Sequence, residues 1–228
     1  MIGGKAAPGY ANAKAIIKLI TAVGDRVNRD ESVGDLLKVV FLPNYNVSAA
    51  QVIIPATELS EHISTAGTEA SGTSNMKFVM NGGLIIGTMD GANVEIAEEI
   101  GEENMFIFGE RVDGVGKIRQ AMAEGQRDYV GSRLRRVFDS IKNGMFGDVS
   151  VMHHIIDSLC DGGDHYITCF DFYPYIEAQN KVDDTYKDYK KWTQMAINGV
   201  AMSGKFSSDR TISQYCNEIW DIEPFPTP

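Results

Sequence analysis

Apolar residues near the start of the chain recur at the spacing of an α-helix. Between residues 11 and 27 they fall mostly three or four positions apart, at Ile16, Leu19, Ile20, Val23 and Val27. This spacing gives a helix one continuous apolar face. The pattern therefore predicts an amphipathic helix over residues 11–27.

Short apolar runs then alternate with helical patterns as far as residue 108. The runs are rich in β-branched or aromatic residues and cover residues 37–42, 84–86 and 105–108. They predict buried parallel strands. The helical patterns between them cover residues 47–54, 75–80 and 93–100. Short strands separated by helices indicate an α/β fold with a doubly wound, Rossmann-like parallel sheet.

The second half of the chain has a different pattern, in which helix follows helix. Helices are predicted over residues 112–123, 132–142, 149–159, 172–186, 192–202 and 208–220. We therefore assign residues 1–111 to a Rossmann-like α/β core and residues 112–228 to a helical C-terminal part of the same domain. Ile2-Gly3-Gly4 resembles a strand end and the turn into a helix. The sheet is thus expected to be incomplete at its N-terminus, in a piece of a larger protein.

Composition narrows the classes of protein to which the chain can belong. Hydrophobic residues make up 43% and charged residues 23% of the 228 positions, as in folded globular proteins. The net charge of -10 disfavours nucleic acid or an anionic membrane as the main partner. No apolar run approaches the ~20 residues that a membrane helix needs. The three scattered cysteines, without a CxxC motif, indicate free thiols in a reducing compartment.

The densest group of unusual residues lies between Ser64 and Asn93. Small residues and glycines dominate positions 66–74 and lead into a predicted helix. Free N–H groups and the helix dipole attract anions at such a helix start. Lys77, four residues after Thr73, suits a phosphate counter-ion or a Schiff base to a phosphorylated aldehyde cofactor. Glu69 could accept hydrogen bonds from the hydroxyl groups of a polar ligand.

Spacing alone leaves a plainer alternative open for this stretch. Gly72, Thr73 and Ser74 would then only cap the helix, and Lys77 would be an exposed surface residue. The stretch contains neither the GxxxxGK[ST] pattern nor GxGxxG. A dinucleotide site, and with it a nicotinamide-dependent dehydrogenase, is therefore disfavoured.

Other carboxylates and histidines have patterns typical of structural roles. Asp90-Gly91 is typical of a turn, and Glu95 of a carboxylate that stabilises the first turn of a helix. His153 and His154 are adjacent on a predicted helix, so their side chains face apart. A pair of this kind lacks a ligand set, and no metal site is predicted.

The segment EASGTSNMKF, residues 69–78, resembles the cofactor-lysine signature of the α-glucan phosphorylases, the family of glycogen, starch and maltodextrin phosphorylases. Five further segments resemble family blocks in the family's order: GGKAAPGY, ELSEHISTAG, GTMDGANVEI, GEENMFIFG and GKFSSDRTI. The resemblance covers nearly the whole chain and is weakest from about residue 117 to residue 169. NYNVS, Ser74 and ELSEHISTAG look more like plant and protist-type members.

The resemblance implies a fold, an activity and a cofactor. The chain would form most of the second domain of a two-Rossmann-domain glycosyltransferase. Members of this family cleave the terminal α-1,4-glucosidic bond of a glucan with inorganic phosphate and release α-glucose 1-phosphate. Pyridoxal 5′-phosphate is expected as a Schiff base on Lys77, and its phosphate group is expected to exchange a proton with the substrate phosphate.

The resemblance also implies roles for individual residues. The catalytic residues are expected to be Glu69 and Lys77. The cofactor is expected to contact Gly72, Thr73, Ser74 and Lys77, with Tyr45 beside its ring. The terminal glucosyl unit is expected to contact Glu69, Ala70, Ser71 and Gly72.

Part of the family pattern precedes the block that matches Gly3 to Tyr10. It includes the arginine that binds the substrate phosphate, lysines near the cofactor phosphate, and a whole first domain. Expected partners are α-1,4-glucan, inorganic phosphate, that N-terminal domain and a second full-length copy in a homodimer. The expected compartment is the cytoplasm, or a plastid in a plant-like protein. The full-length protein is expected to be the active enzyme, and the isolated chain is expected to be inactive. The competing hypothesis is that the chain is a catalytically silent fragment that only folds or binds weakly.

Overall fold

The computed structural model describes residues 1–126, 129–161, 163–223 and 225. It divides the chain into two compact units, and each unit is built from two segments of the sequence. Unit 1 comprises Met1–Gln51 and Val115–Phe172, and unit 2 comprises Val52–Gly114 and Tyr173–Pro228. The loop of small residues at 66–74 and the helix that follows it therefore lie within unit 2.

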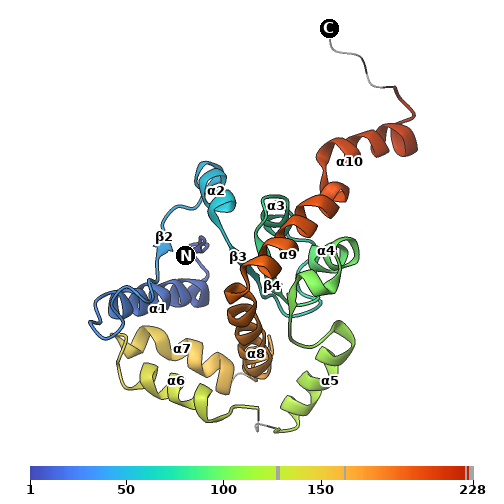
Figure 1. Cartoon of the computed structure of the whole chain (residues 1–228). Helices are drawn as coiled ribbons and strands as arrows, with labels where there is room; N and C mark the ends of the chain where they lie inside the picture. The colour runs from blue at the N-terminus through green and yellow to red at the C-terminus, as the bar shows by residue number, and fades with distance from the viewer. Residues whose placement is uncertain (127–128, 162, 224, 226–228) are drawn as a thin grey trace. The chain divides into compact units, whose positions relative to one another are not determined.

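Unit 1 is mainly helical. Its elements are β1 (Ile2–Gly3), α1 (Ala11–Asn28), β2 (Phe41–Leu42), most of α2 (Val47–Ile53), most of α5 (Val112–Ala123), α6 (Ser132–Lys142), α7 (Val149–Cys160) and the start of α8 (Thr168–Lys187). Helix α7 packs against both α1 and α6 (Figure 1). A buried apolar cluster joins α6 to α7 and includes Leu134, Phe138 and Ile156.

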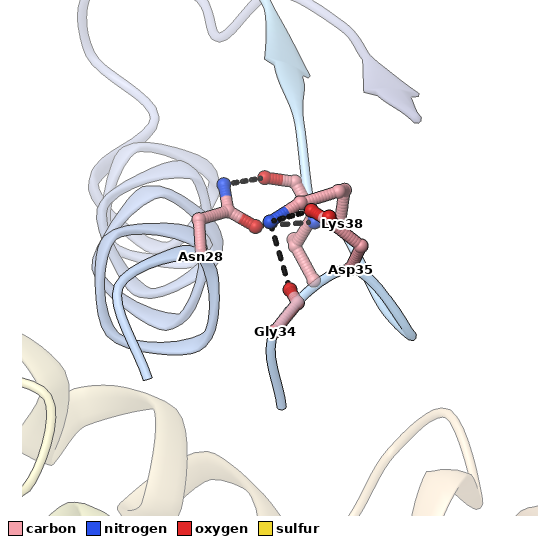
Figure 2. Close-up of polar contacts among 5 residues, drawn as sticks. Asn28, Gly34, Asp35 and Lys38 are labelled. Atoms are coloured by element: carbon pink, nitrogen blue, oxygen red, sulfur yellow. Dashed lines mark hydrogen bonds and ion pairs between the residues drawn. The ribbon is translucent and has the colours of Figure 1, made fainter. Parts of the chain in front are cut away.

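Strand β2 is shorter than the strand predicted over residues 37–42. It covers Phe41–Leu42 and pairs in parallel with β1. At the end of α1, the Asn28 side chain donates to the Val39 carbonyl at 2.8 Å and accepts from the Val39 N–H at 2.9 Å (Figure 2). Because these bonds satisfy both backbone groups of Val39, regular strand pairing begins only after it.

Unit 2 contains a three-stranded parallel sheet. Its elements are the end of α2, η1 (Ile54–Ala56), β3 (Leu59–His62), α3 (Ser74–Met80), β4 (Leu84–Gly87), α4 (Ala92–Ile100), η2 (Glu102–Asn104), β5 (Phe106–Ile107), the rest of α8, α9 (Tyr189–Met202), η3 (Ser203–Phe206), α10 (Ser208–Tyr215) and η4 (Cys216–Trp220). The strand order is β3-β4-β5. Helix α3 connects β3 to β4, and α4 connects β4 to β5 (Figure 1).

Helices cover both faces of this sheet. Along β4, Leu84 and Ile86 pack on one face with residues of α8 and α9, among them Trp192. The intervening Ile85 packs on the other face with residues of α3 and α4, among them Val79. All of these side chains are buried. A strand that is buried on both faces is a continuous apolar run, which explains why the sequence marks β4 clearly.

The predicted helices are present, with small shifts at several ends. Those predicted over 112–123 and 132–142 have the same bounds in the structure. Two expectations need correction. Residues 59–62 form strand β3, which the apolar pattern did not mark, and the helix predicted over 208–220 is α10 followed by the π-helical segment η4. The coarse prediction of an α/β fold with parallel strands is confirmed.

The structure also tests two expectations drawn from composition. None of the described helices is both long and apolar enough to cross a lipid bilayer. Cys160, Cys169 and Cys216 form no disulfide with one another, as the scattered cysteine pattern predicts. Burial raises the pKa of the Cys169 thiol well above its usual value, so this cysteine is an inert core residue.

Candidate functional site

Two loops leave the same edge of the sheet in unit 2. Strands β3 and β4 are parallel, and their last residues, His62 and Gly87, lie opposite each other. The chain that follows β3 leads to α3, and the chain that follows β4 leads to α4. Carboxyl ends of parallel strands are where α/β proteins place their ligand sites. The loop at residues 63–73 and the turn at residues 88–91 thus form the candidate site.

The carboxylate of Asp90 joins the two loops. It accepts hydrogen bonds from the backbone N–H groups of Gly67 at 2.8 Å, Thr68 at 3.2 Å and Glu69 at 2.8 Å. Asp90 is only 7% exposed. The turn that the sequence predicts at Asp90-Gly91 is present, and the carboxylate bonds add a contact that the sequence did not reveal, because they reach residues 21 to 23 positions away.

Gly91 allows a close approach between the same two loops. Its φ is +50°, in the left-handed region that favours glycine. The Ser71 carbonyl accepts a hydrogen bond from the Ala92 N–H at 2.6 Å, directly beside it. A Cβ at position 91 would lie 2.5 Å from that carbonyl oxygen and 3.0 Å from Cγ of Glu69. A side chain here would therefore displace both Ser71 and Glu69.

A buried amide pair connects α3 to α4 beneath the loop. Asn75 Nδ2 donates to Asn93 Oδ1 at 3.0 Å. Asn93 Nδ2 in turn donates to the carbonyl of Thr88 at 2.9 Å and, at 3.3 Å, to that of His62. A Cβ at Gly87 would lie 2.7 Å from Asn93 Nδ2. The start of α3 is thus held to the ends of both strands.

Three of the predicted cofactor contacts lie together at the start of α3. Gly72 has a φ of +74°, Thr73 is the residue just before the helix, and Ser74 is its first residue. The Thr73 side chain makes no capping hydrogen bond. The alternative that this segment only caps a helix is therefore not supported for Thr73. The Met76 N–H is bonded to Asn75 Oδ1 at 3.0 Å, whereas the hydroxyl groups of Thr73 and Ser74 and the backbone N–H groups before Met76 suit a phosphate.

Lys77 follows one turn later on α3. It is exposed, and its ammonium forms no ion pair within the part of the chain that the structure describes. An accessible amine beside a phosphate-type donor set is the arrangement that a phosphorylated aldehyde needs. The residues present therefore fit a cofactor of this class.

The remaining predicted site residues occupy different surroundings. Glu69 and Ala70 are exposed in the loop, and the Ser71 hydroxyl donates to the Gly72 carbonyl at 2.9 Å. Tyr45 belongs to unit 1, where a Cβ at Gly3 would lie 3.1 Å from its ring. Its place beside a cofactor ring stays a prediction.

His62 is a neutral residue at the end of β3. Burial lowers its pKa to about 4. Its Nε2 lies 2.9 Å from Ser60 Oγ, and its ring meets Phe78 edge-on at a centroid distance of 5.9 Å. These contacts explain the presence of His62 as packing.

The potential metal ligands among the described residues are scattered. His153 pairs with Asp157, its neighbour one turn along α7. Within the described residues, no three His, Cys, Asp or Glu side chains gather in a way that could hold a metal ion.

Comparisons with known proteins agree with the motif resemblance. A family model described as carbohydrate phosphorylase matches residues 1–222. The chain is 55% identical to glycogen phosphorylase 2 of Dictyostelium discoideum, over 100% of this chain and 23% of that protein. It is 53% identical to the cytosolic α-glucan phosphorylase 2 of Arabidopsis thaliana, over 100% of this chain and 28% of that protein.

A human relative gives the same result. The chain is 55% identical to the muscle form of glycogen phosphorylase of Homo sapiens, over 98% of this chain and 27% of that protein. The chain thus spans about a quarter of the length of the curated relatives that it matches. Because the family model covers almost every residue and these identities exceed half, the chain belongs to the carbohydrate phosphorylase family.

Proposed function

We propose that the protein carrying this chain is an α-1,4-glucan phosphorylase, a glycosyltransferase. It cleaves the terminal α-1,4-glucosidic bond of a glucan with inorganic phosphate and releases α-glucose 1-phosphate. One observation supports this most strongly: residues 1–222 match the family model, and the relatives named above are glycogen or α-glucan phosphorylases. The candidate loop lies inside the matched region.

The residues at the start of α3 are proposed to hold pyridoxal 5′-phosphate. Lys77 anchors the cofactor through its exposed amine. Thr73 and Ser74 bind the cofactor phosphate with N–H and hydroxyl groups, Gly72 contacts the cofactor beside them, and Tyr45 lies beside its ring. When bound, the cofactor supplies a phosphate group that can pass a proton to and from the substrate phosphate.

The loop before α3 is proposed to bind the terminal glucosyl unit. The Glu69 carboxylate accepts a hydrogen bond from a sugar hydroxyl, since a carboxylate has acceptor oxygens only. Backbone N–H groups of Ala70, Ser71 and Gly72 donate to other sugar oxygens. The exposure of Glu69, Ala70 and Ser71 supports this role, because these groups are accessible to a ligand.

The wider context follows the same proposal. Helices on both faces of the parallel sheet support a doubly wound second domain of a two-Rossmann-domain glycosyltransferase. Its partners are an N-terminal domain of the same protein, glucan, inorganic phosphate and a second copy in a homodimer. The cytosol is the proposed compartment, in keeping with the relative from Arabidopsis thaliana whose name includes "cytosolic".

The full-length protein that carries this chain provides the test. Incubated with maltodextrin and inorganic phosphate, it should release α-glucose 1-phosphate, and Lys77→Ala should abolish the release. Lys190→Ala removes another exposed lysine of unit 2 and is the matched control. Failure of the unaltered protein to release the product, with cofactor supplied, would instead favour a catalytically silent relative.

A further inference from the structure

The turn Asp90-Gly91 is the feature of unit 2 that the proposed function leaves without a role. It lies between β4 and α4 and touches the sugar-binding loop directly. Backbone bonds fix it at both sides, since the Asp90 N–H donates to the Thr88 carbonyl at 3.0 Å and the Asn93 N–H donates to the Asp90 carbonyl at 3.1 Å. Its carboxylate is therefore presented by a rigid turn.

We propose that Asp90 is a positioning residue, which sets the place of the Glu69 carboxylate by binding three successive N–H groups of the loop. This inference rests on the proposed function, in which Glu69 contacts the glucosyl unit. Asp90 itself touches the loop backbone and acts through Glu69.

The geometry of the clamp supports this role. One carboxylate oxygen accepts from Gly67, and the other accepts from both Thr68 and Glu69. Three consecutive N–H groups that converge on one carboxylate must share one orientation, which leaves the loop little freedom at these residues. The last of them belongs to Glu69, so the clamp ends at the residue whose side chain is meant to meet the sugar.

Gly91 leaves space for the side chain of Glu69. Because position 91 carries no Cβ, the Cγ atom of Glu69 and the Ser71 carbonyl can both lie against it. Asp90 therefore orients the backbone of Glu69, and Gly91 leaves room for its stem. Both act at the sugar end of the loop, whereas Lys77 lies beyond it on α3.

Asp90→Asn is the most direct variant, because it keeps the size of the side chain. An amide has one acceptor oxygen, and its NH₂ group would face a backbone N–H, so part of the clamp is lost. In the full-length protein we expect kcat/KM for phosphorolysis to fall about 10-fold, as for the loss of a hydrogen bond to a charged group. Glu58→Gln is the matched control: it changes a carboxylate of unit 2 that accepts from Trp192 Nε1, at the other end of β3.

A double-mutant cycle with Glu69→Gln separates positioning from general stability. If Asp90 acts through Glu69, Asp90→Asn should lower kcat/KM by less than about 3-fold further once Glu69 is already Gln. The shift in Tm caused by Asp90→Asn should be the same in both backgrounds. If the separate effects of Asp90→Asn and Glu69→Gln on kcat/KM multiply in the double variant, the proposal is overturned.

A glycine variant tests the second half of the proposal. Gly91→Ala should also lower kcat/KM, because its Cβ would lie 2.5 Å from the Ser71 carbonyl oxygen and 3.0 Å from Cγ of Glu69, and the part of the effect that acts through Glu69 should be lost in the Glu69→Gln background. Gly116→Ala on α5 is the matched control, since a Cβ there would meet nothing within 4 Å. If Gly91→Ala and Gly116→Ala change kcat/KM equally, the proposed role of Gly91 is overturned.

Amide hydrogen exchange provides a readout that does not depend on activity. In Asp90→Asn, the N–H groups of Gly67 to Glu69 should exchange at least about 10-fold faster, while those of β4 keep their rates. Unchanged exchange at Gly67 to Glu69 would overturn the clamp whether or not the protein is a phosphorylase. A protein without phosphorylase activity but with faster exchange would retain the clamp and reject the proposed function.

Discussion

At the scale of single residues, the site combines an exposed amine with a rigidly held loop. Lys77 is accessible on α3. The backbone N–H groups of residues 67–69, in contrast, are bound by the buried Asp90 carboxylate. Exposure suits a group that must form a covalent bond to an incoming cofactor, and rigidity suits groups that must recognise one sugar orientation. Different substitutions should therefore affect cofactor and substrate separately.

Lys77 is the residue through which cofactor binding is tested. Reduction of the full-length protein with borohydride should fix pyridoxal phosphate covalently on the peptide that contains Asn75 to Phe78, as mass spectrometry can show. Lys77→Ala should lose stable cofactor binding, and Lys190→Ala should retain it. A label on any other lysine would contradict the assignment.

Glu69 is the residue through which sugar recognition is tested. Glu69→Gln in the full-length protein should lower kcat/KM for phosphorolysis by roughly 10²-fold, because a charged hydrogen bond that tightens in the transition state is lost. Cofactor content should stay unchanged, since Lys77 is intact. Glu177→Gln changes an exposed glutamate of α8 within unit 2 and is the matched control. Unaltered kinetics in Glu69→Gln would mean that Glu69 only supports the loop.

His62 makes the stability of the sheet edge depend on pH. Its pKa is lowered to about 4 in the folded protein by burial, whereas an unfolded histidine titrates near about 6.5. Between these values the unfolded chain binds a proton that the folded chain does not. Its contribution to the free energy of unfolding is thus complete above pH 6.5 and is lost as the pH falls toward 4, by at most about 1.4 kcal/mol per pH unit.

Urea unfolding at several pH values measures this effect. His62→Gln should flatten the dependence of the free energy of unfolding on pH in that window. His154→Gln, which removes an exposed histidine of α7, is the matched control. The same slope in His62→Gln and in the unaltered protein would contradict the prediction.

At the scale of elements, sequence patterns predict helices well and strand limits poorly. The start of α8 shows why some limits are not visible. The Asp164 carboxylate accepts from the N–H groups of Thr168 and Cys169 at 2.9 and 2.7 Å, so the helix begins at Thr168 rather than at the predicted residue 172. The preceding Ile167 has a φ of +48°. A β-branched residue rarely adopts that conformation, and no spacing rule marks it.

Asn28 tests how a side chain sets the limit of an element. Asn28→Ala removes both hydrogen bonds to Val39 and should lower the free energy of unfolding by about 1 kcal/mol, the usual net value for bonds of this kind at an exposed position. The adjacent Lys38 keeps its bond to the Gly34 carbonyl and its ion pair with Asp35 (Figure 2). Asn12→Ala, at the other end of α1, is the matched control in urea unfolding. Equal stability of the two variants would contradict the role of Asn28.

At the scale of the whole molecule, the sequence predicts where the candidate loop lies but not which contacts hold it in place. The glycines and small residues before α3 mark the loop, because parallel strands place such loops at one sheet edge. The clamp by Asp90 could not be predicted, since it depends on how closely two loops approach in space. The expected roles of Glu69 and Lys77 rest on the motif resemblance, because spacing alone left open the alternative of a capped helix with a surface lysine.

The last prediction concerns these 228 residues on their own. Apolar side chains of α10 and η4 are exposed, with Ile212 at 51%, Ile219 at 67% and Trp220 at 50%. A surface of this kind favours aggregation when nothing covers it. The relatives are about four times longer than this chain, and the motif resemblance leads us to expect the basic residues that bind the substrate phosphate outside these residues. Charge stabilisation of that kind is a large part of catalysis.

We therefore expect the isolated chain to release no α-glucose 1-phosphate from maltodextrin and phosphate and to bind pyridoxal phosphate weakly. The full-length protein, assayed in parallel, is the control for substrate and cofactor quality. Light scattering should show association of the isolated chain, and Ile219→Ser should reduce it, because it removes the most exposed apolar residue of α10 and η4. Comparable turnover by the isolated chain would show that unit 1 and unit 2 contain all the groups that the reaction needs.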